Sequence, residues 1–208
     1  AAEAAVSFGE FLLDQQKHRA ALDVFDQGLE MSLEALGKAE GNTSIIRQLW
    51  PLYLGLGECL LFDGKVREAL EAKQASAQYA SDEFRETISM LEAEQLRSFS
   101  GDEARSFEDV RAAIPSELLA EEGRINLEFA FLAAASAGGK KAAAEDSQTN
   151  QQFAQRTKDC ISFLDQARSL GTLDAKDLAW IRSHPFFEHL VDDQALGDWM
   201  DQFDEATE

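Results

Sequence analysis

The sequence predicts an all-α protein of stacked helical hairpins, on three observations. Residues that favour helices are abundant and only 3 prolines occur in 208 residues. No run alternates apolar with polar residues over the length of a strand. Residues 9–23 and 57–71 match without a gap at eight of fifteen positions. A repeat on helical spacing is typical of stacked hairpins, because a single unit cannot bury its apolar face alone.

The first predicted hairpin covers about residues 2–40. Its first helix, from about residue 2 to 15, carries small and bulky residues on one face: Ala5, Phe8, Gly9 and Leu12. After a polar break at residues 15–17, the second helix carries apolar and small residues at the same spacing: Ala21, Leu22, Phe25, Gly28 and Leu29. We expect this helix to end at Gly37 or Gly41.

The second predicted hairpin covers about residues 50–80. A turn at Asp63 and Gly64 separates its two helices. Pro51 is expected in the first turn of the first helix, where a proline loses no hydrogen bond. Residues 41–50 are therefore predicted to be a linker or a separate short turn.

A third hairpin is predicted over about residues 82–114. The run Ala93-Glu94-Gln95-Leu96 matches Gly57-Glu58-Cys59-Leu60 and marks a third copy of the repeat. Its helices are expected at about 82–99 and 103–114, and Pro115 ends the second of them.

A fourth hairpin is predicted over about residues 116–170. It begins with a long helix, 116–137, and continues through a mobile loop, 138–150, which starts with two glycines and two lysines. Shorter apolar pieces follow at 173–204. All of these elements are expected to form one domain, residues 1–208.

The spacing of the repeated residues resembles the tetratricopeptide repeat. That family places a bulky residue before a small one, an apolar residue three positions on, and alanine twelve positions after the small one. The first hairpin matches it with Phe8, Gly9, Leu12, Ala21, Phe25 and Gly28. The second matches it with Tyr53, Leu56, Gly57, Leu60 and Ala69. The resemblance implies a right-handed superhelical stack of antiparallel hairpins, in which the small residues let paired helices touch.

The chain departs from that family at three points. Lys73 stands where the second unit should carry an aromatic residue, and no proline closes either unit. The repeats are forty-eight residues apart, whereas the family's usual spacing is about thirty-four. Longer helices or an additional turn are needed to absorb the difference.

The C-terminal run from Asp177 to Phe187 resembles a segment that closes tetratricopeptide arrays in many large bacterial proteins, some of them with a serine/threonine kinase domain. This resemblance implies that residues 173–204 cap the last hairpin, because the end of a stack exposes an apolar face. Two alternatives are a ligand site or a dimer patch made by the aromatic residues here: Trp180, Phe186, Phe187 and Trp199.

Charge favours a basic partner. The chain carries 39 acidic and 19 basic side chains, a net charge of -20. Such a field repels nucleic-acid phosphates and anionic lipid, so neither is an expected partner, and no segment is apolar enough to span a membrane. Cys59 and Cys160 are predicted to be buried thiols rather than a disulfide, which favours the cytoplasm as the compartment.

The sequence indicates no catalytic, cofactor or metal site. His184 and His189 are five residues apart, which places them on different faces of a helix. The Gly138-Gly139-Lys140-Lys141 run lacks the first glycine and the final hydroxyl of a phosphate-binding loop. We therefore expect a protein that is not an enzyme.

The resemblance implies a binding groove on the concave surface, which is lined by the first helix of each hairpin. The residue after each small position looks into such a groove, and here that residue is Glu10, Glu58 or Glu94. The remaining expected groove residues surround these three: Glu3, Val6, Leu13, Leu54, Leu61, Met90 and Arg97. Carboxylates mixed with aliphatic side chains suit a basic, amphipathic peptide or helix.

The expected function is therefore that of a scaffold for protein–protein interaction. One alternative is the C-terminal regulatory region of a larger bacterial enzyme, such as a serine/threonine protein kinase. Another is a self-associating structural module. The sequence does not define the oligomeric state.

Overall fold

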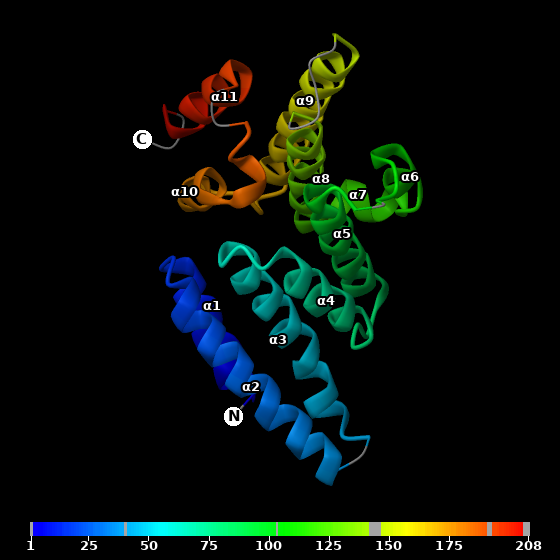
Figure 1. The fold of residues 1–208 in the computed structure, drawn as a ribbon, viewed down its shortest axis with the longest axis vertical. Helices are drawn as coiled ribbons and strands as arrows, with labels where there is room; N and C mark the ends of the chain where they lie inside the picture. Colours follow the sequence, from blue (N-terminus) through cyan, green and yellow to red (C-terminus); the bar gives the residue numbers. More distant parts are fainter. Residues whose placement is uncertain (1, 40, 103, 142–146, 191–192, 206–208) are drawn as a thin grey trace. The chain divides into compact units, whose positions relative to one another are not determined.

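The computed structural model describes residues 2–39, 41–102, 104–141, 147–190 and 193–205. Within these residues all regular secondary structure is helical (Figure 1), which confirms the predicted all-α fold. The chain divides into two compact units, Ala1–Ala93 (unit 1) and Glu94–Glu208 (unit 2). The boundary falls inside one helix, α5, Glu83–Ser100.

Unit 1 contains two helical hairpins and the first part of α5. The hairpin helices are α1 Ala2–Asp14, α2 His18–Lys38, α3 Thr43–Phe62 and α4 Val66–Ala77. The helix α1 packs against α2 and α3, α2 packs against α3, and α3 packs against α4 (Figure 1). Buried side chains between them include Phe25, Leu49 and Leu52, each 0% exposed.

The two turns of these hairpins repeat each other. Gln16 and Gly64, forty-eight positions apart, have φ values of 55° and 75°. Their amides donate to Leu13 O at 2.8 Å and Leu61 O at 3.0 Å, and the next residue's amide donates back into the helix in both turns. Both helices therefore end in the same left-handed motif, at the predicted positions.

Small residues bring the helices of unit 1 into close contact, as the repeat predicts. A Cβ on Gly9 would lie 2.5 Å from Phe25 Cζ, and a Cβ on Gly55 would also clash with that ring. In the second hairpin, a Cβ on Gly57 would lie 2.8 Å from Lys73 Cε. The Gly9–Phe25 contact of the first hairpin thus recurs as Gly57–Lys73 in the second.

The predicted linker at 41–50 is wrong, because α3 begins at Thr43. The Asn42 side chain caps this helix by accepting hydrogen bonds from the amides of Ser44 and Ile45. Pro51 lies inside α3 and not in its first turn. Packing of Leu49 and Leu52, on either side of the proline, compensates for the helix hydrogen bond that a proline removes.

Unit 2 contains the end of α5 and the helices α6 Phe107–Ala112, α7 Ser116–Glu121, α8 Gly123–Lys141, α9 Ser147–Ser169, α10 Ala175–Ser183 and α11 Gln194–Glu205, with the 3-10 turn η1 Pro185–Phe187. The helices α8 and α9 form its main hairpin, and α7, η1 and α6 pack against α8. Within α8, residues 125–135 are all buried. The centre of unit 2 is therefore a helix that is buried on every side, mostly by apolar residues but including Asn126 and Glu128.

Three predicted boundaries in unit 2 are wrong. The helix expected at 103–114 is limited to α6, and the long helix expected at 116–137 is broken at Glu122, whose φ is -107° and ψ 97°. Asn126 stabilises this break because its side-chain amide donates to Leu119 O at 2.8 Å and to Glu122 O at 3.2 Å. The predicted loop at 138–150 begins later, because α8 continues to Lys141; residues 142–146 lie outside the described residues.

Candidate functional site

The ten residues predicted to line a groove lie on three helices. Glu3, Val6, Glu10 and Leu13 are on α1, and Leu54, Glu58 and Leu61 are on α3. Contact between α1 and α3 brings these two sets into one unit. On α5, Met90 belongs to unit 1, whereas Glu94 and Arg97 belong to unit 2.

Several of these ten residues have structural roles. Val6 and Leu13 pack against the core of unit 1, and Leu61 is buried at 4% exposure. The Glu94 side chain, also 4% exposed, pairs with Arg97 Nη1 at 2.6 Å and with Arg105 Nε at 3.3 Å. A partner could reach only the exposed members of the set, and the groove itself remains a prediction.

Glu58 belongs to a buried ionic cluster in unit 1. Lys73 Nζ lies 2.6 Å from Glu92 Oε2 and 3.8 Å from Glu58 Oε2. The Lys73 and Glu92 side chains are only 5% and 6% exposed, so the lysine joins α4 to α5 inside the unit. Lys73 occupies the position at which the repeat pattern of the Sequence analysis has an aromatic residue.

The exposed carboxylates of unit 1 are arranged on one edge of α1. Glu3, Glu10 and Asp14 are all exposed, and at 100° per residue they fall within a narrow arc of the helix. This edge faces away from the side of α1 that carries Gly9 and Leu12, which are buried. Three carboxylates on this edge of α1 are therefore accessible, and two of them, Glu3 and Glu10, were predicted to line the groove.

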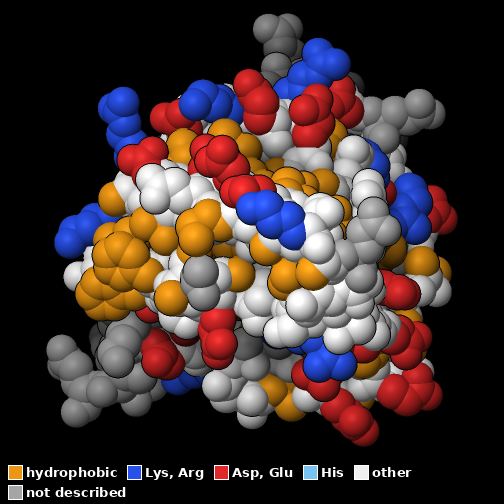
Figure 2. Space-filling model, turned by 90° about the horizontal axis from the view of Figure 1, so that it is seen from below, with side chains coloured by type: hydrophobic (Ala, Val, Ile, Leu, Met, Phe, Trp, Pro, Cys, Tyr) orange, Lys and Arg blue, Asp and Glu red, His pale blue; other side chains and the backbone are white. Residues whose placement is uncertain are grey.

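Two large aromatic side chains lie on the same outer face of α1. Phe8 and Phe11 are each 53% exposed, and their rings stack with centroids 6.3 Å apart and an interplanar angle of 14°. Phe8 was predicted to lie on the packed face of this helix together with Gly9 and Leu12, and that prediction is wrong. Phe11 was not predicted as a surface residue of interest. Its position on α1, between the acidic edge and Phe8, was the signal that it lies on the exposed side of the helix. Figure 2 shows that exposed hydrophobic side chains have acidic neighbours on the face drawn there.

The aromatic residues of the C-terminal segment form the interior of unit 2. Phe131 of α8 contacts Trp180, His184 and Phe187, with ring centroids 4.8, 4.6 and 5.0 Å away. Phe186 and Phe187 are 1% and 0% exposed. On α11, the indole N–H of Trp199 donates to Asp165 Oδ1 of α9 at 2.7 Å. These side chains cover α8 and α9 and do not make an exposed aromatic patch.

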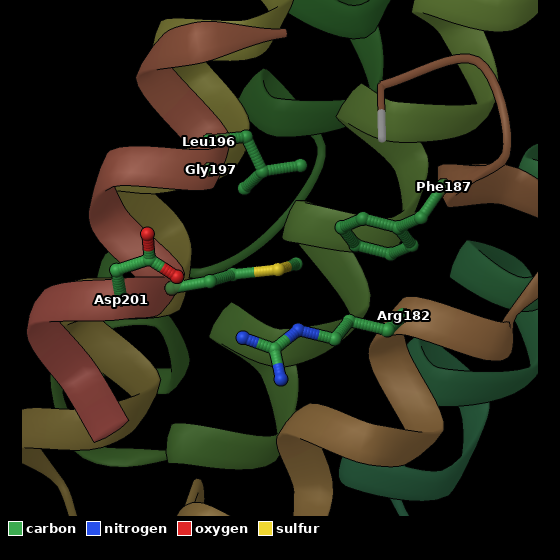
Figure 3. Close-up of a pocket in the computed structure, with 6 residues that line it drawn as sticks. Arg182, Phe187, Leu196, Gly197 and Asp201 are labelled. Carbon is green, nitrogen blue, oxygen red and sulfur yellow. The ribbon is translucent and has the colours of Figure 1, made fainter. Parts of the chain in front are cut away.

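A small pocket opens between α10 and α11 in unit 2 (Figure 3). Its volume is about 190 Å³, and its lining residues are Arg182, Phe187, Leu196, Gly197, Met200 and Asp201. Pockets that hold cofactors or drug-sized ligands are typically about 300–1,000 Å³. The space is therefore suited to an apolar group no larger than one side chain.

The cysteines do not provide a reactive thiolate. Both are free and buried, one in each unit, as predicted. Burial raises the pKa of Cys59 to about 12, and burial also raises the pKa of Cys160. Both thiols are therefore protonated near neutral pH.

No group of three or more histidine, cysteine, aspartate or glutamate residues in the described part of the chain is placed to hold a metal ion. None of the described helices combines the length and apolar character needed to cross a bilayer.

Comparison of the chain with protein-family models, with curated proteins and with solved structures finds no significant match. The function must therefore be inferred from the residues themselves, and above all from the outer face of α1.

Proposed function

We propose that this chain is a non-catalytic interaction module that binds a basic, amphipathic peptide or helix. The observation that carries this proposal is the exposed acidic row of α1, Glu3, Glu10 and Asp14, on a chain whose net charge is -20. Carboxylates held on a preformed helix attract lysine and arginine side chains, and they increase the rate at which a basic partner associates.

The architecture proposed for this module is a tetratricopeptide-like, right-handed stack of helical hairpins. Its support is the recurrence of Gly9 against Phe25 as Gly57 against Lys73, together with the matching left-handed turns at Gln16 and Gly64. A rigid stack reduces the ordering cost of binding, because its surface is formed before the partner arrives.

Two labelled peptides test the proposed function. One is a synthetic helix-forming peptide of leucine and lysine with the leucines on one face, and the other has glutamate in place of every lysine. Fluorescence anisotropy should show binding of the lysine peptide and much weaker binding of the glutamate peptide. Equal affinity for both peptides, or no binding of the lysine peptide, would overturn the proposal.

A further inference from the structure

We infer that the outer face of α1 is the docking surface of this module, and that its occupant is a helix with an apolar face bordered by lysine or arginine. This inference rests on the proposed function and assigns it a location. The docking surface consists of the aromatic pair Phe8 and Phe11 and the acidic edge Glu3, Glu10 and Asp14.

The aromatic pair provides the apolar anchor. Phe8 and Phe11 are the phenylalanines among the large hydrophobic residues that are exposed in the described part of the chain. Their rings stack on one face of α1. Phenylalanine side chains offer large areas for burial, and a small aromatic cluster commonly carries most of the energy of an interface. The other exposed hydrophobics of unit 1, Met31 and Leu33 on α2, are two positions apart and point to different sides of their helix.

The acidic edge determines which kind of helix fits. Glu3, Glu10 and Asp14 are separated by about two turns and one turn of α1, so they follow one border of the aromatic pair. A partner helix that packs its apolar face on Phe8 and Phe11 therefore brings its flanking residues next to three carboxylates. Lysine or arginine at those flanking positions makes favourable pairs, and the long stems of these side chains cover apolar surface as well.

The same charges disfavour a second copy of this chain as the occupant. A symmetric dimer uses the same patch on both copies, so each acidic edge would meet the other or lie close to it. Like charges brought together at an interface oppose association. The face is therefore complementary to a basic helix and not to itself.

Binding of the leucine–lysine peptide to two double variants tests this location. Phe8→Ala with Phe11→Ala removes the anchor, and alanine at exposed helical positions favours the helix. Met31→Ala with Leu33→Ala is the matched control, because it removes exposed apolar surface from α2 in the same unit. We expect the first variant to bind at least about tenfold more weakly than the wild type and the control to bind as the wild type does.

Two further measurements keep the inference falsifiable. Amide hydrogen exchange on the wild-type chain should show that the peptide protects residues 2–14, and protection confined to other helices would overturn the inference. Sedimentation equilibrium of the wild type and the Phe8→Ala, Phe11→Ala variant tests the alternative occupant. A wild-type dimer that the variant abolishes would assign the face to a second copy and overturn the basic-helix assignment.

The location and the function can fail separately. If the wild type binds the lysine peptide and the Phe8→Ala, Phe11→Ala variant binds it equally well, the docking surface is wrong and the proposed function stands. If the wild type does not bind the lysine peptide at all, both are wrong.

Discussion

Phe25 lies with the edge of its ring against glycines from two different helices, Gly9 of α1 and Gly55 of α3. Its side chain is 0% exposed. A methyl group at either glycine would occupy the space of the ring. The absence of two side chains is therefore what lets three helices meet around one aromatic residue.

Gly9→Ala should destabilise the chain by about 1–3 kcal/mol, because the new methyl group overpacks a filled core. Gly37→Ala is the matched control: it is also a helical glycine, but nothing lies within 4 Å of its added Cβ. The control should be neutral or more stable by up to about 1 kcal/mol, because alanine favours helix. Urea unfolding of both variants measures the difference. Equal stability of the two variants would show that the Gly9–Phe25 contact is not close.

At the residue scale the sequence predicted small residues well and exposed aromatics poorly. Gly9 and Gly57 could be assigned to helix contacts because the repeat places a small residue where two backbones must approach. Phe8, next to Gly9, was assigned to the same interface, yet it is 53% exposed. A residue one position from a buried glycine is rotated by about 100° around the helix, and the repeat pattern alone does not define how wide the buried face is.

At the scale of elements, packing rather than local sequence decided the helix boundaries that were predicted incorrectly. Pro51 indicated a helix start, but the Asn42 cap and the buried residues Leu49 and Leu52 extend α3 backwards to Thr43. The capping side chain at Asn42 was a readable signal. The break at Glu122 was not, because it depends on the contact of Asn126 with Leu119 O and Glu122 O, which forms only in the folded chain.

The ionic cluster of Lys73, Glu58 and Glu92 links α3, α4 and the first part of α5. Where the first hairpin fills the space beside its glycine with Phe25, the second uses the stem of Lys73 and carries a charge into the interior. A buried charge pair is a weak source of net stability, but breaking it leaves a charge without compensation. The cluster therefore restricts which residue of α5 can lie next to α4.

Lys73→Met should destabilise the chain by about 3–5 kcal/mol, because Glu92 and Glu58 are left close together without the cation. The double variant Lys73→Met, Glu92→Leu should recover most of that loss, since it replaces the closest charge pair with apolar side chains. Urea unfolding of the wild type, of Lys73→Met, of Glu92→Leu and of the double variant forms a complete double-mutant cycle. Additive losses in the double variant would contradict the coupling of Lys73 with Glu92.

At the scale of the whole molecule, composition gave the all-helical class and the acidic character, and both depend on residue types rather than on contacts. Predicting the groove residues required knowing which helix faces stay exposed to solvent in the folded chain. In the repeat pattern Leu61 matches Leu13 and Glu94 matches Glu10, but Leu61 and Glu94 are buried. Leu61 packs inside unit 1, and Glu94 pairs with Arg97 and Arg105. Accessibility of this kind is decided by tertiary packing, which a periodic pattern does not contain.

The central claim is that an acidic, preformed helical surface recognises a basic helix through charge as well as apolar contact. The most direct measurement is the affinity of the wild-type chain for the leucine–lysine peptide over a salt series from low to physiological ionic strength. Screening of exposed charges predicts an affinity that decreases steadily as salt is added. An affinity that stays constant across the series would contradict the claim.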